Sequence, residues 1–168
     1  NRFDSSQSFE SYLEKSYCKT ASLIANSSKA IGVLSDVDQE SLNSLYFFGR
    51  QLGLAFQVVD DILDFTGNDE QLGKPAASDL QSGYLTAPVF YALDENPSLS
   101  ELINDKFSQK DDLDKALSLV RDSSAIRKSR ELAEKFATEA KDSISWLPDS
   151  PSKKALLELP EFVISRLY

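Results

Sequence analysis

The hydrophobic and polar positions of this chain repeat mostly with the three-to-four-residue period of α-helices. The longest such stretch runs from about residue 39 to about residue 67. Asp36 or Asp38 could cap its start, and Gly67 is suited to its end. No stretch alternates convincingly in the manner of a β-strand. The pattern therefore predicts an all-α fold.

Shorter helical stretches lie on both sides of the long one. We expect them at about residues 9–17, 19–34, 86–93, 98–107, 111–121, 123–146 and 152–167. The segment between Gly67 and the helix near residue 86 contains Gly73, Pro75 and Gly83, which favour a loop. No internal repeat or low-complexity segment interrupts this organisation.

Composition excludes several classes of function. With 168 residues, 41% of them apolar and 27% charged, the chain can bury the core of one soluble domain. A formal net charge of -9 argues against a nucleic-acid partner, because phosphate backbones require clustered Lys and Arg. No apolar run reaches the roughly 20 residues needed for a transmembrane helix. An anionic ligand would need a local basic site or bridging metal cations.

The chain contains no histidine and one cysteine. This excludes Ser-His-Asp triads, ordinary zinc sites and disulfide frameworks. We expect Cys18 to be a small buried apolar residue, as free cysteines usually are. The chain also contains no methionine, so we expect Asn1 not to be the natural start.

Three aspartates interrupt the apolar end of the long predicted helix. At about 100° per residue, Gln57, Asp60, Asp61 and Asp64 fall on one narrow face, and Gly53 would leave that face open. The carboxylates repel one another and oppose the negative end of the helix dipole. Mg2+ would relieve this repulsion, and it typically joins one or two protein carboxylates to substrate phosphates. The stripe predicts a Mg2+ site for a phosphorylated ligand, the alternative being a metal-free scaffold with solvated aspartates.

Two lysines are candidates to bind such a ligand. Lys74 lies in the predicted loop, and Lys19 precedes Thr20 at the break between the first two helical stretches. Either ammonium could bind phosphate oxygens, although solvated lysine is the default. A second acidic run, DDLD at residues 111–114, lies at a helix start, so we expect it to have a structural role in capping that helix.

Three blocks of sequence resemble one enzyme family. They are KTASL at 19–23, FGRQLGLAFQVVDDILDF at 48–65 and LGKPAASDLQSGYLTAP at 72–88, and together they resemble the C-terminal half of trans-type polyprenyl diphosphate synthases. IRKSRELAEKFATEA at 126–140 and FVISRLY at 162–168 extend the resemblance over nearly the whole chain. The TAP block and the ending are similar to long-chain, solanesyl-type enzymes of cyanobacteria and plastids.

The resemblance implies an isoprenoid synthase fold and a known reaction. In such enzymes, Mg2+ holds the diphosphate of an allylic prenyl diphosphate, which leaves as pyrophosphate. The double bond of isopentenyl diphosphate attacks the resulting carbocation, and loss of a proton completes a five-carbon extension. The resemblance also implies a homodimer in the cytoplasm or the plastid stroma, whose long-chain product could pass to a membrane.

Site residues follow by position from the same resemblance. Asp60, Asp61 and Asp64 match the family's second aspartate-rich motif, which binds Mg2+ directly or through water. Lys74 and Lys19 match lysines that contact the diphosphate, and Thr20 matches a threonine near the reacting centre. The remaining matches are a glutamine beside the metal motif, an aromatic residue that lines the pocket and an aspartate in the following loop, at Gln57, Phe56 and Asp79.

The family's first aspartate-rich motif has no counterpart in this chain. We therefore expect residues 1–168 to be the C-terminal part of a single synthase domain whose N-terminal half is absent from this chain. Such a fragment would be incomplete for catalysis. The alternative is a non-catalytic regulatory subunit or remnant of a heteromeric prenyl synthase.

Overall fold

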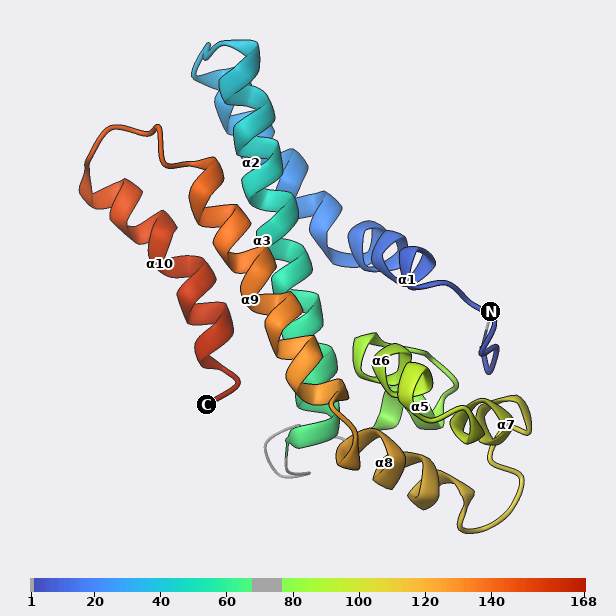
Figure 1. Ribbon diagram of the computed structural model, residues 1–168. Helices are drawn as coiled ribbons and strands as arrows, with labels where there is room; N and C mark the ends of the chain where they lie inside the picture. Colours follow the sequence, from blue (N-terminus) through green and yellow to red (C-terminus); the bar gives the residue numbers. More distant parts are fainter. Residues whose placement is uncertain (1, 68–76) are drawn as a thin grey trace. The chain divides into compact units, whose positions relative to one another are not determined.

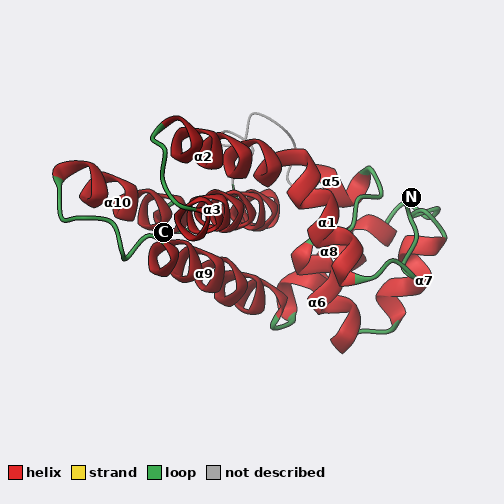
Figure 2. Cartoon of the chain, turned by 90° about the horizontal axis from the view of Figure 1, so that it is seen from above, coloured by secondary structure: helices red, strands yellow, loops and turns green. Residues whose placement is uncertain are grey.

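The computed structural model describes residues 2–67 and 77–168, and these residues form helices joined by loops. No strand occurs in these two ranges (Figure 2). The predicted all-α class is confirmed. No helix in the described part of the chain is both long and apolar enough to cross a membrane.

The observed helices agree closely with the predicted stretches. They are α1 (Phe9–Ser16), the π-helix η1 (Tyr17–Ala21), α2 (Ser22–Leu34), α3 (Gln39–Thr66), α5 (Ser78–Gln81), α6 (Ala87–Glu95), α7 (Ser98–Asn104), α8 (Asp112–Asp122), α9 (Ala125–Ser143) and α10 (Pro151–Ser165) (Figure 1). The main difference is α5, a single turn within the predicted loop. Pro88 is accommodated at the start of α6 as expected.

Asp38 caps the start of α3, as the sequence predicted. The Ser41 amide donates to Asp38 Oδ1 at 2.8 Å, which is the geometry of an N-terminal cap. This backbone hydrogen bond lowers the pKa of Asp38. Asp36 instead adopts a positive φ of 52° in the turn between α2 and α3.

The chain falls into two compact units. The first comprises Asn1–Tyr12 and Asp60–Glu131, and the second comprises Leu13–Val59 and Leu132–Tyr168. The boundaries fall within α1, α3 and α9, so each of these helices contributes residues to both units.

In the second unit, η1 and α2 pack closely against α3. A Cβ atom added to Gly53 would lie 2.5 Å from the Cα of Ala21, and one added to Gly49 would lie 2.6 Å from the carbonyl oxygen of Ile24. The expectation that Gly53 leaves an open face is therefore wrong. Gly53 is buried because the helix backbones approach too closely there for any side chain.

Polar contacts join the remaining helices of the second unit. The Gln51 amide in α3 donates to Glu139 in α9, and Lys141 in α9 pairs with Glu161 in α10 at 2.7 Å. The apolar core under these contacts includes Leu54, Ala55, Val58, Val59 and Ile144.

In the first unit, the end of α3 is covered by short helices. α6, α7 and α8 contact one another, and their buried side chains include Val89, Leu99, Ile103 and Val120. Arg121 in α8 donates to the carbonyl oxygen of Phe65 at 3.2 Å. This contact places a cation at the negative end of α3, which is electrostatically favourable.

Glu95 at the end of α6 holds the start of α9. Its carboxylate accepts hydrogen bonds from Lys128 Nζ at 2.8 Å, from the Ser124 hydroxyl, and from the Ser124 amide at 3.1 Å. These donors, Lys128 first, lower the pKa of Glu95 from 4.5 to about 2. The fold therefore favours the ionised carboxylate.

We predict that Glu95→Gln makes stability less dependent on acid pH. Because the folded pKa is depressed, the contribution of Glu95 is complete above its ordinary value of 4.5 and is lost as pH falls toward about 2. Urea unfolding of both proteins should show a wild-type advantage near neutral pH that shrinks across this window. A difference that does not change with pH would contradict the assignment.

Candidate functional site

The predicted aspartate stripe lies at the end of α3. Asp61 and Asp64 are 3% and 1% exposed, whereas Asp60 is partly exposed. Gln57, one turn earlier, is also buried. Because α3 is an α-helix throughout Gln39–Thr66, these four side chains have the common face that their spacing predicted.

Tyr12 holds one of the buried carboxylates. Its hydroxyl donates to Asp61 Oδ2 at 2.7 Å. Tyr12 lies in α1 and is itself buried, with its ring centroid 5.4 Å from that of Phe9 and 5.8 Å from that of Phe90. This packing restricts the phenol ring, so the Asp61 side chain is held by a rigid donor. No local sequence pattern pairs Tyr12 with Asp61, so sequence reasoning missed this contact.

The start of α5 holds the other buried carboxylate. Ser78 Oγ donates to Asp64 Oδ1 at 3.1 Å, and the Asp79 amide donates to Asp64 Oδ2 at 3.2 Å. The Ala77 amide donates to the backbone oxygen of Asp64 at 2.6 Å. Asp79, which the resemblance had selected, therefore contacts the aspartate stripe through its backbone amide. Ser78 was missed, although a serine at a helix start is a recognisable capping signal.

The donor set of this stripe fits Mg2+. Within residues 2–67 and 77–168, no three acidic or cysteine side chains gather closely enough to hold a metal ion by themselves. Mg2+ does not require such a cage, because it typically combines one or two carboxylates with waters and phosphate oxygens. Asp60 and Asp61 are adjacent oxygen donors of this kind. Their role as ligands stays a prediction.

A second group of predicted residues comes together in the second unit. Thr20 Oγ1 in η1 donates to Gln57 Oε1 in α3 at 2.8 Å. Lys19, also in η1, is exposed. The break that the sequence placed at these residues is a π-helical turn, in which the Ser22 amide donates to the Tyr17 oxygen. Such turns are rare and often occur at functional sites.

Phe56 presents one face to an arginine from the end of the chain. Its side chain is 37% exposed, and the guanidinium carbon of Arg166 lies 4.8 Å from its ring centroid. This separation is typical of a cation–π contact. Arg166 lies at the end of α10, so sequence spacing alone could not have paired it with Phe56.

Lys74 lies outside the described residues. The structure therefore does not place it relative to the aspartates, and its predicted contact with diphosphate stays a prediction.

The acidic run at the start of α8 has a structural role, but not the capping role that was expected of it. Asp112 is buried and accepts a hydrogen bond from the Gln109 amide at 2.9 Å. It also forms an ion pair with Lys115 at 3.4 Å. Asp111, the residue before the helix, makes no side-chain capping bond. The expected capping bond is therefore not formed, and Asp112 instead fastens the turn before α8 to the start of the helix.

Cys18 is exposed, so the expectation of a buried filler is wrong. It lies in η1, and its thiol donates to Glu14 Oε1 at 3.6 Å. Desolvation raises the pKa of this thiol, and the hydrogen bond and negative charge of Glu14 raise it further. The sulfur is accessible but less ionised than an isolated cysteine.

We predict that Glu14→Gln accelerates alkylation of Cys18. Removing the Glu14 charge lowers the thiol pKa, so a larger fraction is thiolate at a given pH. Iodoacetamide labelling followed by mass spectrometry over a pH series measures both rate and pKa. Labelling of the unfolded chains serves as the control, and identical folded-state profiles would contradict the prediction.

Known proteins resemble this chain over its full length. It is 54% identical over 168 residues to a prenyl transferase of Synechocystis sp., covering 100% of this chain and 52% of that protein. It is 44% identical over 165 residues to the chloroplastic solanesyl diphosphate synthase 2 of Arabidopsis thaliana, covering 98% of this chain and 40% of that protein. The chain thus spans about half the length of the curated relatives it matches.

Solved structures share the fold. The heptaprenyl diphosphate synthase of Staphylococcus aureus superimposes with a TM-score of 0.91 at 32% identity, covering 98% of this chain and 52% of that one. A polyprenyl synthase of Caulobacter crescentus, complexed with calcium and isoprenyl diphosphate, gives a TM-score of 0.86 at 34% identity with the same coverage. The fold is thus that of the isoprenoid synthases. The model of the polyprenyl synthetase family matches residues 1–120, and the chain belongs to this family.

Proposed function

We propose that this chain carries the allylic-diphosphate side of a trans-polyprenyl diphosphate synthase. The enzyme would extend an allylic prenyl diphosphate with isopentenyl diphosphate units to a long-chain product. The observation that carries the proposal is the pair of buried carboxylates of α3, held by Tyr12 and by the start of α5. Membership of the polyprenyl synthetase family supports it.

Burial and hydrogen bonding suit these aspartates to binding a cation. Asp61 and Asp64 are each oriented by donors from other helices, so little side-chain freedom would be lost on binding. Asp60 is partly exposed beside them and could reach a ligand in solvent. When bound there, Mg2+ would supply positive charge to stabilise the departing diphosphate. Lys19 and Lys74 would add cationic contacts to the same diphosphate.

The Thr20–Gln57 pair suits a positioning role near the reacting carbon. The hydrogen bond of 2.8 Å uses the hydroxyl hydrogen of Thr20 and fixes its direction. The lone pairs of that oxygen are therefore held in a fixed orientation and stay available as acceptors. Phe56, which precedes Gln57 in α3, would offer its aromatic face to the substrate pocket. These assignments follow the family pattern at each position.

The same proposal extends to the assembly of the enzyme, its location, its product and the extent of its domain. We propose a homodimeric enzyme in the cytoplasm or the plastid stroma, and one plant relative is named chloroplastic. The similarity to a solanesyl diphosphate synthase favours a long-chain product. We further propose that residues 1–168 are the C-terminal part of one synthase domain.

Two measurements test the proposal. The gene product, expressed from its own start codon, should incorporate labelled isopentenyl diphosphate into an allylic primer only when Mg2+ is present. Calorimetry of the 168-residue chain should detect binding of inorganic pyrophosphate that requires Mg2+. If the protein expressed from its own start codon shows no turnover but the chain binds pyrophosphate, the non-catalytic subunit is favoured. Absence of both turnover and binding would defeat the proposal.

A further inference from the structure

A groove of about 720 Å3 runs between α7 and α8 in the first unit, away from the aspartate stripe in sequence. We call it the α7–α8 groove. It is lined by Ser98, Glu101 and Leu102 of α7 and by Asp111, Asp114, Lys115, Ser118, Leu119 and Asp122 at the start of α8 and along it.

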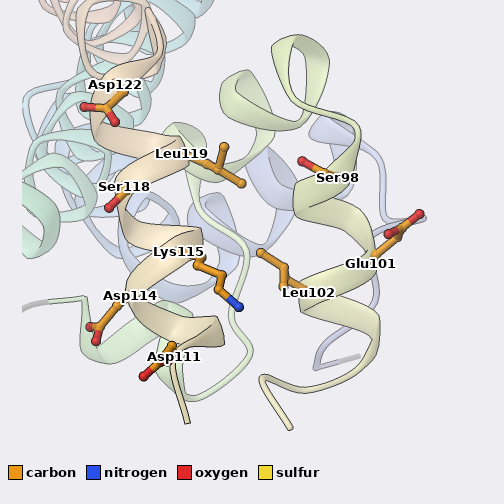
Figure 3. A pocket seen from close by; sticks show the side chains of 9 residues that line it. All are labelled: Ser98, Glu101, Leu102, Asp111, Asp114, Lys115, Ser118, Leu119 and Asp122. Carbon is orange, nitrogen blue, oxygen red and sulfur yellow. The ribbon is translucent and has the colours of Figure 1, made fainter. Parts of the chain in front are cut away.

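The groove has two leucines and one lysine at its centre and carboxylates at its edges (Figure 3). Figure 3 shows Leu102 of α7 and Leu119 and Lys115 of α8 projecting into the space between the two helices. Glu101 points away from α8 on one edge, and Asp114 and Asp122 point away from α7 on the other. Both leucines are only partly buried, so this centre retains apolar surface that faces solvent.

The groove-lining residues of α8 form one continuous face. From residue 111 they recur at intervals of three, four, seven, eight and eleven positions, which is the spacing of one side of a helix. Asp112, Ala116 and Val120 lie between them in sequence and are buried in the unit's core. The groove face of α8 is therefore distinct from the face that is buried in the core of the unit.

Charge decides what could occupy this space. Four carboxylates line the groove, and its single ammonium, on Lys115, is already paired with Asp112 at 3.4 Å. A nucleic acid or an anionic membrane would be repelled. A second copy of this chain, whose net charge is -9, would also be repelled on average.

We propose that the α7–α8 groove docks a basic amphipathic helix of a partner protein. Its apolar residues would contact Leu102 and Leu119, because a third helix packs naturally into the space between two others. Its flanking Lys and Arg residues would face Glu101 on one edge and Asp114 and Asp122 on the other. This interaction is independent of the proposed catalytic function.

A designed peptide provides the probe. We choose a helical peptide with leucines at spacings of three and four residues and lysines or arginines on both flanks, labelled for fluorescence anisotropy against the 168-residue chain. A matched peptide replaces every basic residue with Glu and keeps the leucines. The basic peptide should bind, and the affinity should fall as salt is raised because the flanking charges are exposed.

Two groove variants and one control locate the binding. The double variant Asp114→Lys with Asp122→Lys should weaken binding by about tenfold or more, and Leu119→Ser by about fivefold. Asp142→Lys makes, at one exposed position of α9, the same change of charge as either one of the two groove substitutions, and it should leave binding unchanged. Circular dichroism of each variant confirms that the fold is retained.

Other outcomes would overturn the proposal. They are equal binding of the acidic peptide, equal weakening by Asp142→Lys, or no binding of the basic peptide up to about 1 mM. Self-association of the wild-type chain that Leu119→Ser abolishes, measured by light scattering, would assign the groove to a second copy instead.

Discussion

Replacing Asp61 with asparagine should weaken Mg2+-dependent binding of inorganic pyrophosphate by about a hundredfold. Asparagine preserves the shape of the side chain and can still accept the hydrogen bond from Tyr12, which donates at 2.7 Å in the wild-type protein. What it removes is the negative charge that a hard cation requires. Isothermal calorimetry at fixed Mg2+ measures the change directly.

Two further variants separate metal binding from stability. Asp112→Asn neutralises another buried aspartate of the same unit, one that binds the Gln109 amide, and should leave pyrophosphate binding unchanged. Tyr12→Phe keeps the aromatic packing but removes the donor to Asp61, and we expect a smaller loss of about three- to tenfold. Unchanged affinity in Asp61→Asn would favour a scaffold whose aspartates bind no metal.

Gly53→Ala should lower the free energy of unfolding by about 2 kcal/mol, although glycine-to-alanine changes within helices are ordinarily stabilising. The new Cβ would lie 2.5 Å from Ala21 Cα and 2.8 Å from Ala21 Cβ. Backbone atoms cannot rotate away, so η1 and α3 must separate and lose close packing. Urea denaturation followed by circular dichroism gives the change.

Gly32→Ala is the matched control for this effect. At Gly32 the nearest atoms to an added Cβ are Leu45 Cδ1 at 2.7 Å and Leu42 Cδ2 at 2.8 Å. These are the ends of flexible side chains, which can adjust at lower cost than a backbone. Gly53→Ala should therefore be clearly the less stable variant, and equal stability of the two would contradict a rigid contact between η1 and α3.

Local patterns predicted much of the fold. The long helix was placed at about residues 39–67 and is observed as Gln39–Thr66, because its apolar period and its cap at Asp38 are both local signals. α5 was missed because a single turn carries almost no periodic signal.

The candidate site was harder to predict because its partners are distant in sequence. Thr20 and Gln57 were both selected, but only the structure places their side chains 2.8 Å apart. The contact between Tyr12 and Asp61 spans 49 positions and leaves no trace in either local pattern. Cys18 was misplaced because its burial was expected from the general habit of free cysteines, whereas its position in η1 leaves it exposed.

The hydrogen bond from the Ser22 amide to the Tyr17 oxygen also makes the chain length of this region critical. Each residue of an α-helix turns the chain by about 100°, so deleting one residue from η1 would rotate everything before it relative to α2. Either Thr20 or the residues of α1 would then face the wrong way. A homologue with one residue fewer between Tyr17 and Ser22 would have to orient its threonine by some other means.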